Sequence, residues 1–142
     1  MAELIPVFLW AVGGYLAGSI PFGYLFVRAF RGIDIRTVGS GNIGATNVYR
    51  VAGGRLALAV FVCDMAKGWV PVATASFAGL PSWAGLLTGI AAITGHSFPC
   101  FLKGKGGKGV ATSFGVAIAL VPYAALAALG VWLAVTVASG FV

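Results

Sequence analysis

The chain has 142 residues, of which 60% are hydrophobic and only 8% are charged. Since a soluble domain carries about 25% charged residues, this composition excludes an ordinary soluble protein and predicts an all-α integral membrane protein. The net charge of +6 comes from a few basic residues between apolar runs, which indicates membrane topology and an anionic ligand and argues against nucleic acid as a partner.

The first predicted membrane span covers residues 4–27. It carries no charged side chain and is long enough to cross a hydrocarbon core of ~30 Å. The N-terminal Met-Ala-Glu lacks the basic segment of a secretory signal, so we expect this span to be retained. Pro21 predicts a kink, because its missing N–H leaves a backbone carbonyl without a partner.

Residues 28–55 form the first predicted loop, which is polar and rich in arginine. It contains the stretch Gly39-Ser40-Gly41-Asn42-Ile43-Gly44-Ala45-Thr46-Asn47, flanked by Arg36 and Arg50. Closely spaced glycines allow tight turns with exposed N–H groups, which form anion-binding nests. The pattern predicts a phosphate site, although a plain polar loop between two membrane helices fits these residues about as well.

The second predicted span, residues 56–78, contains Asp64 and Lys67. A spacing of three residues places both on one face of a helix. Charged residues inside a membrane are costly and are functional candidates by default. The pair fits a mutually neutralising structural role against other helices, and it also fits a supporting role in a polar site.

Three further spans are expected at 83–101, 109–121 and 123–140, which gives about five spans in total. A second glycine-rich loop at 102–108 contains Lys103-Gly104-Lys105-Gly106-Gly107-Lys108 and leads into Gly109. With these spans both basic loops lie on one side of the membrane, where they can meet. The positive-inside rule predicts that this side is cytoplasmic and that the N-terminus is outside.

Several familiar motifs fail on their context. Both glycine stretches match GxGxxG, but neither lies in a βαβ unit, and Lys108 is not followed by Ser or Thr as in a P-loop. No serine lies in a GxSxG elbow. His96 has no acidic residue five positions later, so it fits a structural role as well as a general base. Cys63 and Cys100 define no framework, and neither a metal nor a cofactor is expected.

The two glycine loops together closely resemble the first two signature motifs of the bacterial acyl-phosphate:glycerol-3-phosphate acyltransferases, the PlsY family. The second motif includes Gly95-His96-x-Phe98-Pro99 and the lysine-glycine run up to Val110-Ala111-Thr112. Gly18-Ser19-Ile20-Pro21-Phe22-Gly23 and Asp64-x-x-Lys67-Gly68 are similar to that family as well. The resemblance runs from the first span to the end of the chain.

This resemblance implies an enzyme of the bacterial inner membrane with its active site facing the cytoplasm. Such an enzyme transfers a fatty acyl group from acyl phosphate to glycerol 3-phosphate, giving lysophosphatidic acid, and a soluble acyl-phosphate-producing enzyme is an expected partner. The family has about seven spans and a third polar motif after the fifth. The 142 residues end before that motif, so we expect either a fragment or a site without those groups.

The resemblance also implies roles for individual residues. The expected catalytic residues are Ser40, Lys105 and Lys108. Asp64 and Lys67 are expected to support the site. The expected substrate-binding residues come from both loops and the end of one span: Gly39, Gly41, Asn42, Gly44, Thr46, Asn47, Arg50, His96, Gly104, Gly106, Gly107 and Gly109.

The main alternative is a small transporter or channel for a phosphorylated anion, since it also requires membrane spans and basic loops. Alternating access expects a site at the midplane of the membrane, whereas both basic loops here are predicted on one side. A non-catalytic scaffold for a lipid-synthesis enzyme is a third reading. Uptake into vesicles favours the transporter, and a covalent change in an added substrate excludes both alternatives.

Overall fold

The computed structural model describes residues 4–140. Over this range it contains helices and turns but no strand, which confirms the predicted all-α membrane fold. Two single turns of 3₁₀ helix, Ile35–Thr37 and Cys100–Leu102, lie within the loops. The helices are α1 (Leu4–Ser19), α2 (Phe22–Arg31), α3 (Ala45–Ala52), α4 (Gly54–Phe77), α5 (Ser82–Ser97), α6 (Val110–Leu120) and α7 (Pro122–Ser139).

Four helical stretches of the described chain are long and apolar enough to cross a membrane. They are Leu4–Arg31, Gly54–Phe77, Ser82–Leu102 and Pro122–Ser139. The predicted span at 109–121 corresponds to α6, which has 11 residues and a length of only ~16 Å, about half of the hydrocarbon core. Helix α6 ends at Leu120 because Pro122 disfavours helical backbone at the preceding residue, Val121.

The first predicted span is broken in two at Pro21. Helix α1 ends at Ser19 and α2 begins at Phe22 and continues to Arg31, so the helix extends beyond the predicted end at residue 27. At this break the carbonyl of Ile20 accepts hydrogen bonds from the N–H of Phe22 at 3.1 Å and from the Lys67 ammonium of α4 at 2.7 Å. A buried side chain therefore helps to satisfy a backbone group that is no longer part of a regular helix.

The predicted loop at 28–55 is more ordered than its glycine content indicates. It holds the last turn of α2, the 3₁₀ turn, all of α3 and the start of α4. A hydrophobic cluster beneath it joins these elements to α4 and the second loop, and this cluster holds the polar end of the molecule on the membrane helices. Its buried members are Val27, Ile35, Ile43, Val48, Ala52, Ala57, Val60 and Leu102.

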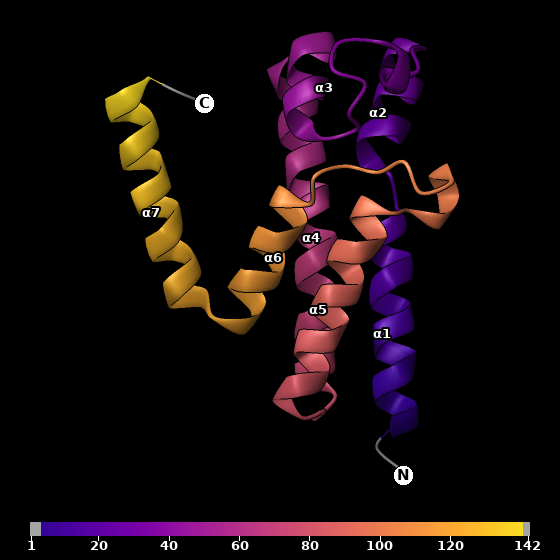
Figure 1. Cartoon of the computed structure of the whole chain (residues 1–142), viewed down its shortest axis with the longest axis vertical. Helices are drawn as coiled ribbons and strands as arrows, with labels where there is room; N and C mark the ends of the chain where they lie inside the picture. The colour runs from indigo at the N-terminus through magenta and orange to yellow at the C-terminus, as the bar shows by residue number, and fades with distance from the viewer. Residues whose placement is uncertain (1–3, 141–142) are drawn as a thin grey trace.

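Glycines let the membrane helices approach one another closely. A Cβ at Gly18 of α1 would overlap the backbone of Ala92 in α5, and a Cβ at Gly95 would overlap the carbonyl of Tyr15. Gly68 of α4 packs in the same way on the backbone of Thr112 in α6. Such small-residue contacts are typical of helix packing in lipid. Figure 1 shows α1, α4 and α5 side by side, with α7 leaning away.

Substitution of Gly18 by Ala tests this close packing. We expect Gly18→Ala to lower the free energy of unfolding by about 1–3 kcal/mol, because the added methyl group meets backbone that cannot move away. The matched control is Gly13→Ala in the same helix, where a Cβ would meet nothing within 4 Å. Thermal unfolding in detergent measures both variants, and an equal loss at the two positions would contradict the packing described.

Candidate functional site

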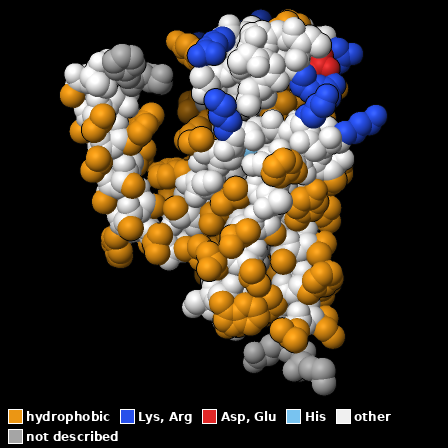
Figure 2. All heavy atoms as spheres, in the orientation of Figure 1, with side chains coloured by type: hydrophobic (Ala, Val, Ile, Leu, Met, Phe, Trp, Pro, Cys, Tyr) orange, Lys and Arg blue, Asp and Glu red, His pale blue; other side chains and the backbone are white. Residues whose placement is uncertain are grey.

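Both glycine loops line one cavity of about 440 Å³ beside α4. Figure 2 shows the Lys and Arg side chains gathered at the end of the molecule that carries the loops, above a largely apolar surface. The cavity is walled by small, polar and basic residues with a few large apolar ones: Ser40, Asn42, Gly44, Ala45, Thr46, Asn47, Arg50, Phe61, Asp64, His96, Lys108, Gly109, Val110, Ala111 and Trp132.

Two helix N-termini meet at this cavity. Helix α3 begins at Ala45, and Gly44, Ala45 and Thr46 lie on the cavity wall. Helix α6 begins directly after Gly109, and Gly109, Val110 and Ala111 lie on the wall as well. The first N–H groups of a helix have no intrahelical acceptor and carry partial positive charge. Each of these helix ends is therefore suited to bind a phosphate or carboxylate.

The cavity is also cationic. Between residues 4 and 140 the two acidic side chains, Asp34 and Asp64, are paired with Arg36 and Lys67. Seven of the nine Lys and Arg residues therefore have no acidic partner in the described chain. Two of the seven, Arg50 and Lys108, line the cavity. An anion that enters it meets positive charge without a competing free carboxylate.

The buried side chain of Asn47 holds the first glycine loop in shape. Its amide nitrogen donates to the carbonyls of Asn42 at 2.9 Å, Val38 at 3.2 Å and Ile35 at 3.4 Å. Its oxygen accepts a hydrogen bond from the N–H of Ser40 at 2.9 Å. Gly39 has a φ of 60°, and a Cβ there would overlap the Asn47 amide. Asn47 thus fixes the turn that presents Ser40 and Asn42 to the cavity.

The anion-binding nest expected within this loop is largely absent. The N–H of Ser40 donates to Asn47, that of Gly41 to the carbonyl of Val38, and that of Gly44 to the side chain of Asn42. Short polar side chains satisfy nearby backbone groups in this way because they compete locally for hydrogen bonds. The backbone donors available to an anion come instead from the first turn of α3.

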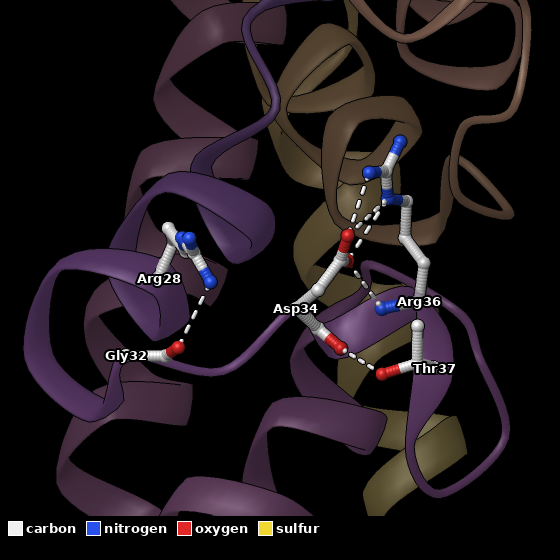
Figure 3. A network of polar contacts seen from close by, with 5 residues as sticks. All are labelled: Arg28, Gly32, Asp34, Arg36 and Thr37. Atoms are coloured by element: carbon white, nitrogen blue, oxygen red, sulfur yellow. Dashed lines mark hydrogen bonds and ion pairs between the residues drawn. The ribbon is translucent and has the colours of Figure 1, made fainter.

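Arg36, predicted to flank the anion site, is engaged elsewhere (Figure 3). Its guanidinium contacts the Asp34 carboxylate at 2.6 Å and lies over the ring of Tyr24 at 4.8 Å. The hydrogen bond from Arg36 lowers the pKa of Asp34 to about 2. Thr37 donates to the Asp34 carbonyl, and Arg28 donates to that of Gly32, both at 2.9 Å. These contacts order residues 28–37, which lead into the glycine loop. None of the residues that make them lines the cavity.

A buried charged cluster lies at the α4 side of the cavity. Lys67 Nζ is 2.8 Å from Asp64 Oδ1, and both side chains are 3% exposed. The Nδ1 atom of His96 lies 3.7 Å from the same oxygen, which is too long for a hydrogen bond. Asp64 and His96 line the cavity, whereas Lys67 lies behind them. The lysine neutralises the one carboxylate on the wall, which reduces its repulsion of an anion.

The second glycine loop packs directly on His96. The N–H of Gly107 donates to the His96 carbonyl at 3.1 Å. A Cβ at Gly107 would overlap His96 Nε2, and a Cβ at Gly106 would overlap the His96 carbonyl. These two glycines therefore permit close contact between the loop and the end of α5, and this contact positions Lys108 and the start of α6.

The structure brings ten of the predicted site residues to the cavity wall and leaves seven away from it. The ten are Ser40, Asn42, Gly44, Thr46, Asn47, Arg50, Asp64, His96, Lys108 and Gly109. Those outside the wall are loop glycines and two lysines: Gly39, Gly41, Lys67, Gly104, Lys105, Gly106 and Gly107. Lys105 is exposed to solvent.

Five wall residues were not predicted from the sequence. Ala45, Val110 and Ala111 belong to the first turns of α3 and α6, so a prediction of where these helices start would have found them. Phe61 lies three residues before Asp64, on the same helix face. Trp132 comes from α7, and no local pattern connects it with either loop.

The comparisons with known proteins all find relatives of one kind. The family described as Glycerol-3-phosphate acyltransferase matches residues 8–142. A glycerol-3-phosphate acyltransferase of Myxococcus xanthus is 55% identical over 124 residues, which are 86% of this chain and 64% of that protein. Glycerol-3-phosphate acyltransferase 5 of Dehalococcoides mccartyi is 50% identical over 122 residues, covering 86% of this chain and 52% of that protein.

Two solved structures of an integral membrane glycerol 3-phosphate acyltransferase, PlsY (YgiH), share the fold. The glycerol 3-phosphate form has a TM-score of 0.86 and 42% identity, covering 93% of this chain and 66% of the other. The lysophosphatidic acid form has a TM-score of 0.84 and 41% identity, covering 92% and 65%. The present chain thus spans about half to two thirds of the length of these relatives.

Two asparagine substitutions test how the first loop is held. Asn47→Asp keeps the acceptor for Ser40 but removes the donor to three carbonyls, so we expect a loss of about 1–3 kcal/mol in the free energy of unfolding. Asn42→Asp keeps the acceptor that Gly44 uses and is the matched control with little expected change. Thermal unfolding and hydrogen exchange over residues 38–44 measure both, and equal effects would exclude the Asn47 network as the cause.

Proposed function

The chain belongs to the glycerol-3-phosphate acyltransferase family, and we propose that it forms the phosphate-binding part of an enzyme that uses acyl phosphate as donor. In the proposed reaction a fatty acyl group passes from acyl phosphate to glycerol 3-phosphate. The products are lysophosphatidic acid and inorganic phosphate. The observation that carries this proposal is the convergence of two helix N-termini and two unpaired cations, Arg50 and Lys108, on one cavity.

The two substrates match this arrangement because each carries a phosphate group. We assign the glycerol 3-phosphate to the N-terminus of α3 with Arg50, whose planar fork suits bidentate phosphate binding. The phosphate of the donor is assigned to the N-terminus of α6 with Lys108. Two sites on one cavity hold the reacting groups close together, and such positioning supplies much of the rate in a two-substrate reaction.

The proposed chemistry is acyl substitution. The 1-hydroxyl oxygen of glycerol 3-phosphate bonds to the acyl carbonyl carbon, and the bond from that carbon to the phosphate oxygen then breaks. Inorganic phosphate leaves with the electron pair. Ser40 and the N–H groups at the start of α6 are the candidate donors to the negative charge that develops on the carbonyl oxygen.

We assign the removal of the hydroxyl proton to a substrate phosphate. His96 is less suited to this step, since Nε2 lies against Gly107 and Nδ1 faces the Asp64 carboxylate beside Lys67. Asp64 is already paired with Lys67. Acyl phosphate is an activated donor, so the reaction does not require a strong protein base. In this proposal His96 has a structural role, because the second glycine loop packs on it.

The distribution of charge supports an orientation in the membrane. The seven cations without acidic partners all come from the two loops or the helix ends next to them. Under the positive-inside rule we place this end in the cytoplasm, the N-terminus outside and the protein in the bacterial inner membrane. A soluble enzyme that produces acyl phosphate would reach the cavity from the same side.

Acyl transfer by the purified protein is the direct test of this function. Long-chain acyl phosphate and labelled glycerol 3-phosphate are supplied in detergent or lipid, with acyl-CoA as the control donor. We expect lysophosphatidic acid from acyl phosphate alone. The 142-residue chain and a version extended to the length of its relatives are assayed side by side, and failure of both folded proteins would overturn the assignment. Uptake of glycerol 3-phosphate without product would instead support a transporter.

The two lysines of the second loop are expected to differ in this assay. Lys108→Ala removes a cation from the cavity wall, and we expect kcat/KM to fall about tenfold to a hundredfold, the cost of losing one charge-assisted hydrogen bond. Lys105→Ala removes the same charge from an exposed position off the wall, and we expect less than a threefold loss. Equal losses would mean that net charge, rather than position, controls the rate.

A further inference from the structure

A second hollow of about 350 Å³ lies where the end of α2 meets the junction of α3 and α4. Its walls are Phe30, Arg31, Ala52, Arg55 and Leu56, so it shares no residue with the cavity described above. The proposed acyl transfer uses none of these side chains. The hollow therefore needs an explanation of its own.

Two arginines give this hollow an uncompensated positive charge. Arg31 donates one N–H to the carbonyl of Ala52 at 2.9 Å, which fixes the guanidinium while most of its five donors stay available. Arg55 lies in the first turn of α4, where the helix dipole disfavours a cation unless an anion is near. The acids Asp34 and Asp64 are paired with other cations, so no carboxylate of the described chain neutralises this pair.

The hollow lies at the end of α4 where the exposed apolar surface of that candidate span begins. Helix α4 is a candidate span, and its exposed apolar side chains begin at Leu58, which is 64% exposed. Arg55 is one turn above that residue. Phe30, beside Arg31, is 71% exposed although it is apolar. Aromatic and cationic side chains occur together at the headgroup level of bilayers, and basic pockets between membrane helices bind anionic headgroups.

We propose that this hollow binds the headgroup phosphate of an anionic phospholipid from the surrounding membrane. The guanidinium groups of Arg31 and Arg55 contact the phosphate, and Phe30 and Leu56 contact the upper part of the acyl chains. The apolar walls and the position beside Leu58 favour a membrane lipid over a soluble phosphate. The site is separate from the acyl-transfer cavity and holds whether or not the chain catalyses acyl transfer.

Lipid binding to the full chain in detergent tests this site, with phosphatidylglycerol as the anionic probe and phosphatidylcholine as the neutral reference. Native mass spectrometry gives the ratio of the two affinities. We expect Arg31→Gln and Arg55→Gln each to lower the preference for phosphatidylglycerol about fivefold, the factor expected for one interfacial arginine. Arg55→Gln is decisive, because Arg31 also supports the backbone of Ala52.

The matched control is Arg28→Gln, which removes the same charge from α2, the helix that also carries Arg31. Arg28 donates to Gly32 and lies outside the hollow, so we expect its lipid preference to stay within twofold of the parent protein. An equal loss in Arg28→Gln would overturn the site in favour of diffuse surface charge. An unchanged preference in Arg55→Gln would overturn it as well.

Inorganic phosphate and Phe30→Ala distinguish a lipid from a free anion. We expect Phe30→Ala to weaken phosphatidylglycerol binding, and we expect millimolar inorganic phosphate to leave it nearly unchanged, because phosphate makes no contact with the apolar walls. Full displacement by phosphate together with no effect of Phe30→Ala would assign the hollow to a soluble anion and overturn the lipid proposal. None of these variants changes a residue of the acyl-transfer cavity. Lipid bound there therefore contributes equally to every measurement.

Discussion

The ammonium of Lys67 joins the break between α1 and α2 to the wall of the cavity. Inside a membrane no water is available to satisfy a broken helix, so each freed backbone group needs a protein partner. Pro21 breaks the first membrane-crossing stretch, and Lys67 donates to the carbonyl of Ile20 at this break. The same ammonium pairs with Asp64 on the cavity wall. One buried cation thus makes the break tolerable and neutralises the carboxylate that faces an anionic ligand.

The break in turn determines where the polar end of the protein lies. Helix α2 restarts at Phe22 and ends in a left-handed Gly32, which leads the chain into the loop that Asn47 holds. A hydrophobic cluster then fixes this loop on α4. On the other side, Gly106 and Gly107 bring the second loop against His96. The cavity results from two loops held by different means, one by an internal amide and the other by close backbone contact.

The fold class and the two loops could be predicted from the sequence because they depend on composition and local pattern. Long uncharged runs predict membrane helices, and Pro21 predicts a kink, where the structure has a full break between α1 and α2. The roles of individual glycines could not be predicted in this way. Gly106 and Gly107 have the composition of a phosphate-binding loop, yet their contact with His96 depends on how α5 ends. Trp132 likewise reaches the cavity only through the turn at Pro122.

The short helix α6 has a consequence for the physical state of a lipid substrate. Figure 1 shows the second loop crossing at the height of the α1–α2 break, below the upper end of α4. The N-terminus of α6 therefore lies within the depth that α4 spans, since Gly68 of α4 packs on the backbone of Thr112 in α6, and Lys108 lines the same cavity as Asp64 of α4. A site above the membrane would require the donor to withdraw its tail from the bilayer, at a cost of about 0.8 kcal/mol for each methylene exposed to water. With the proposed donor, a phosphate-binding site sunk to this depth lets the tail stay dissolved in the lipid while the head reacts.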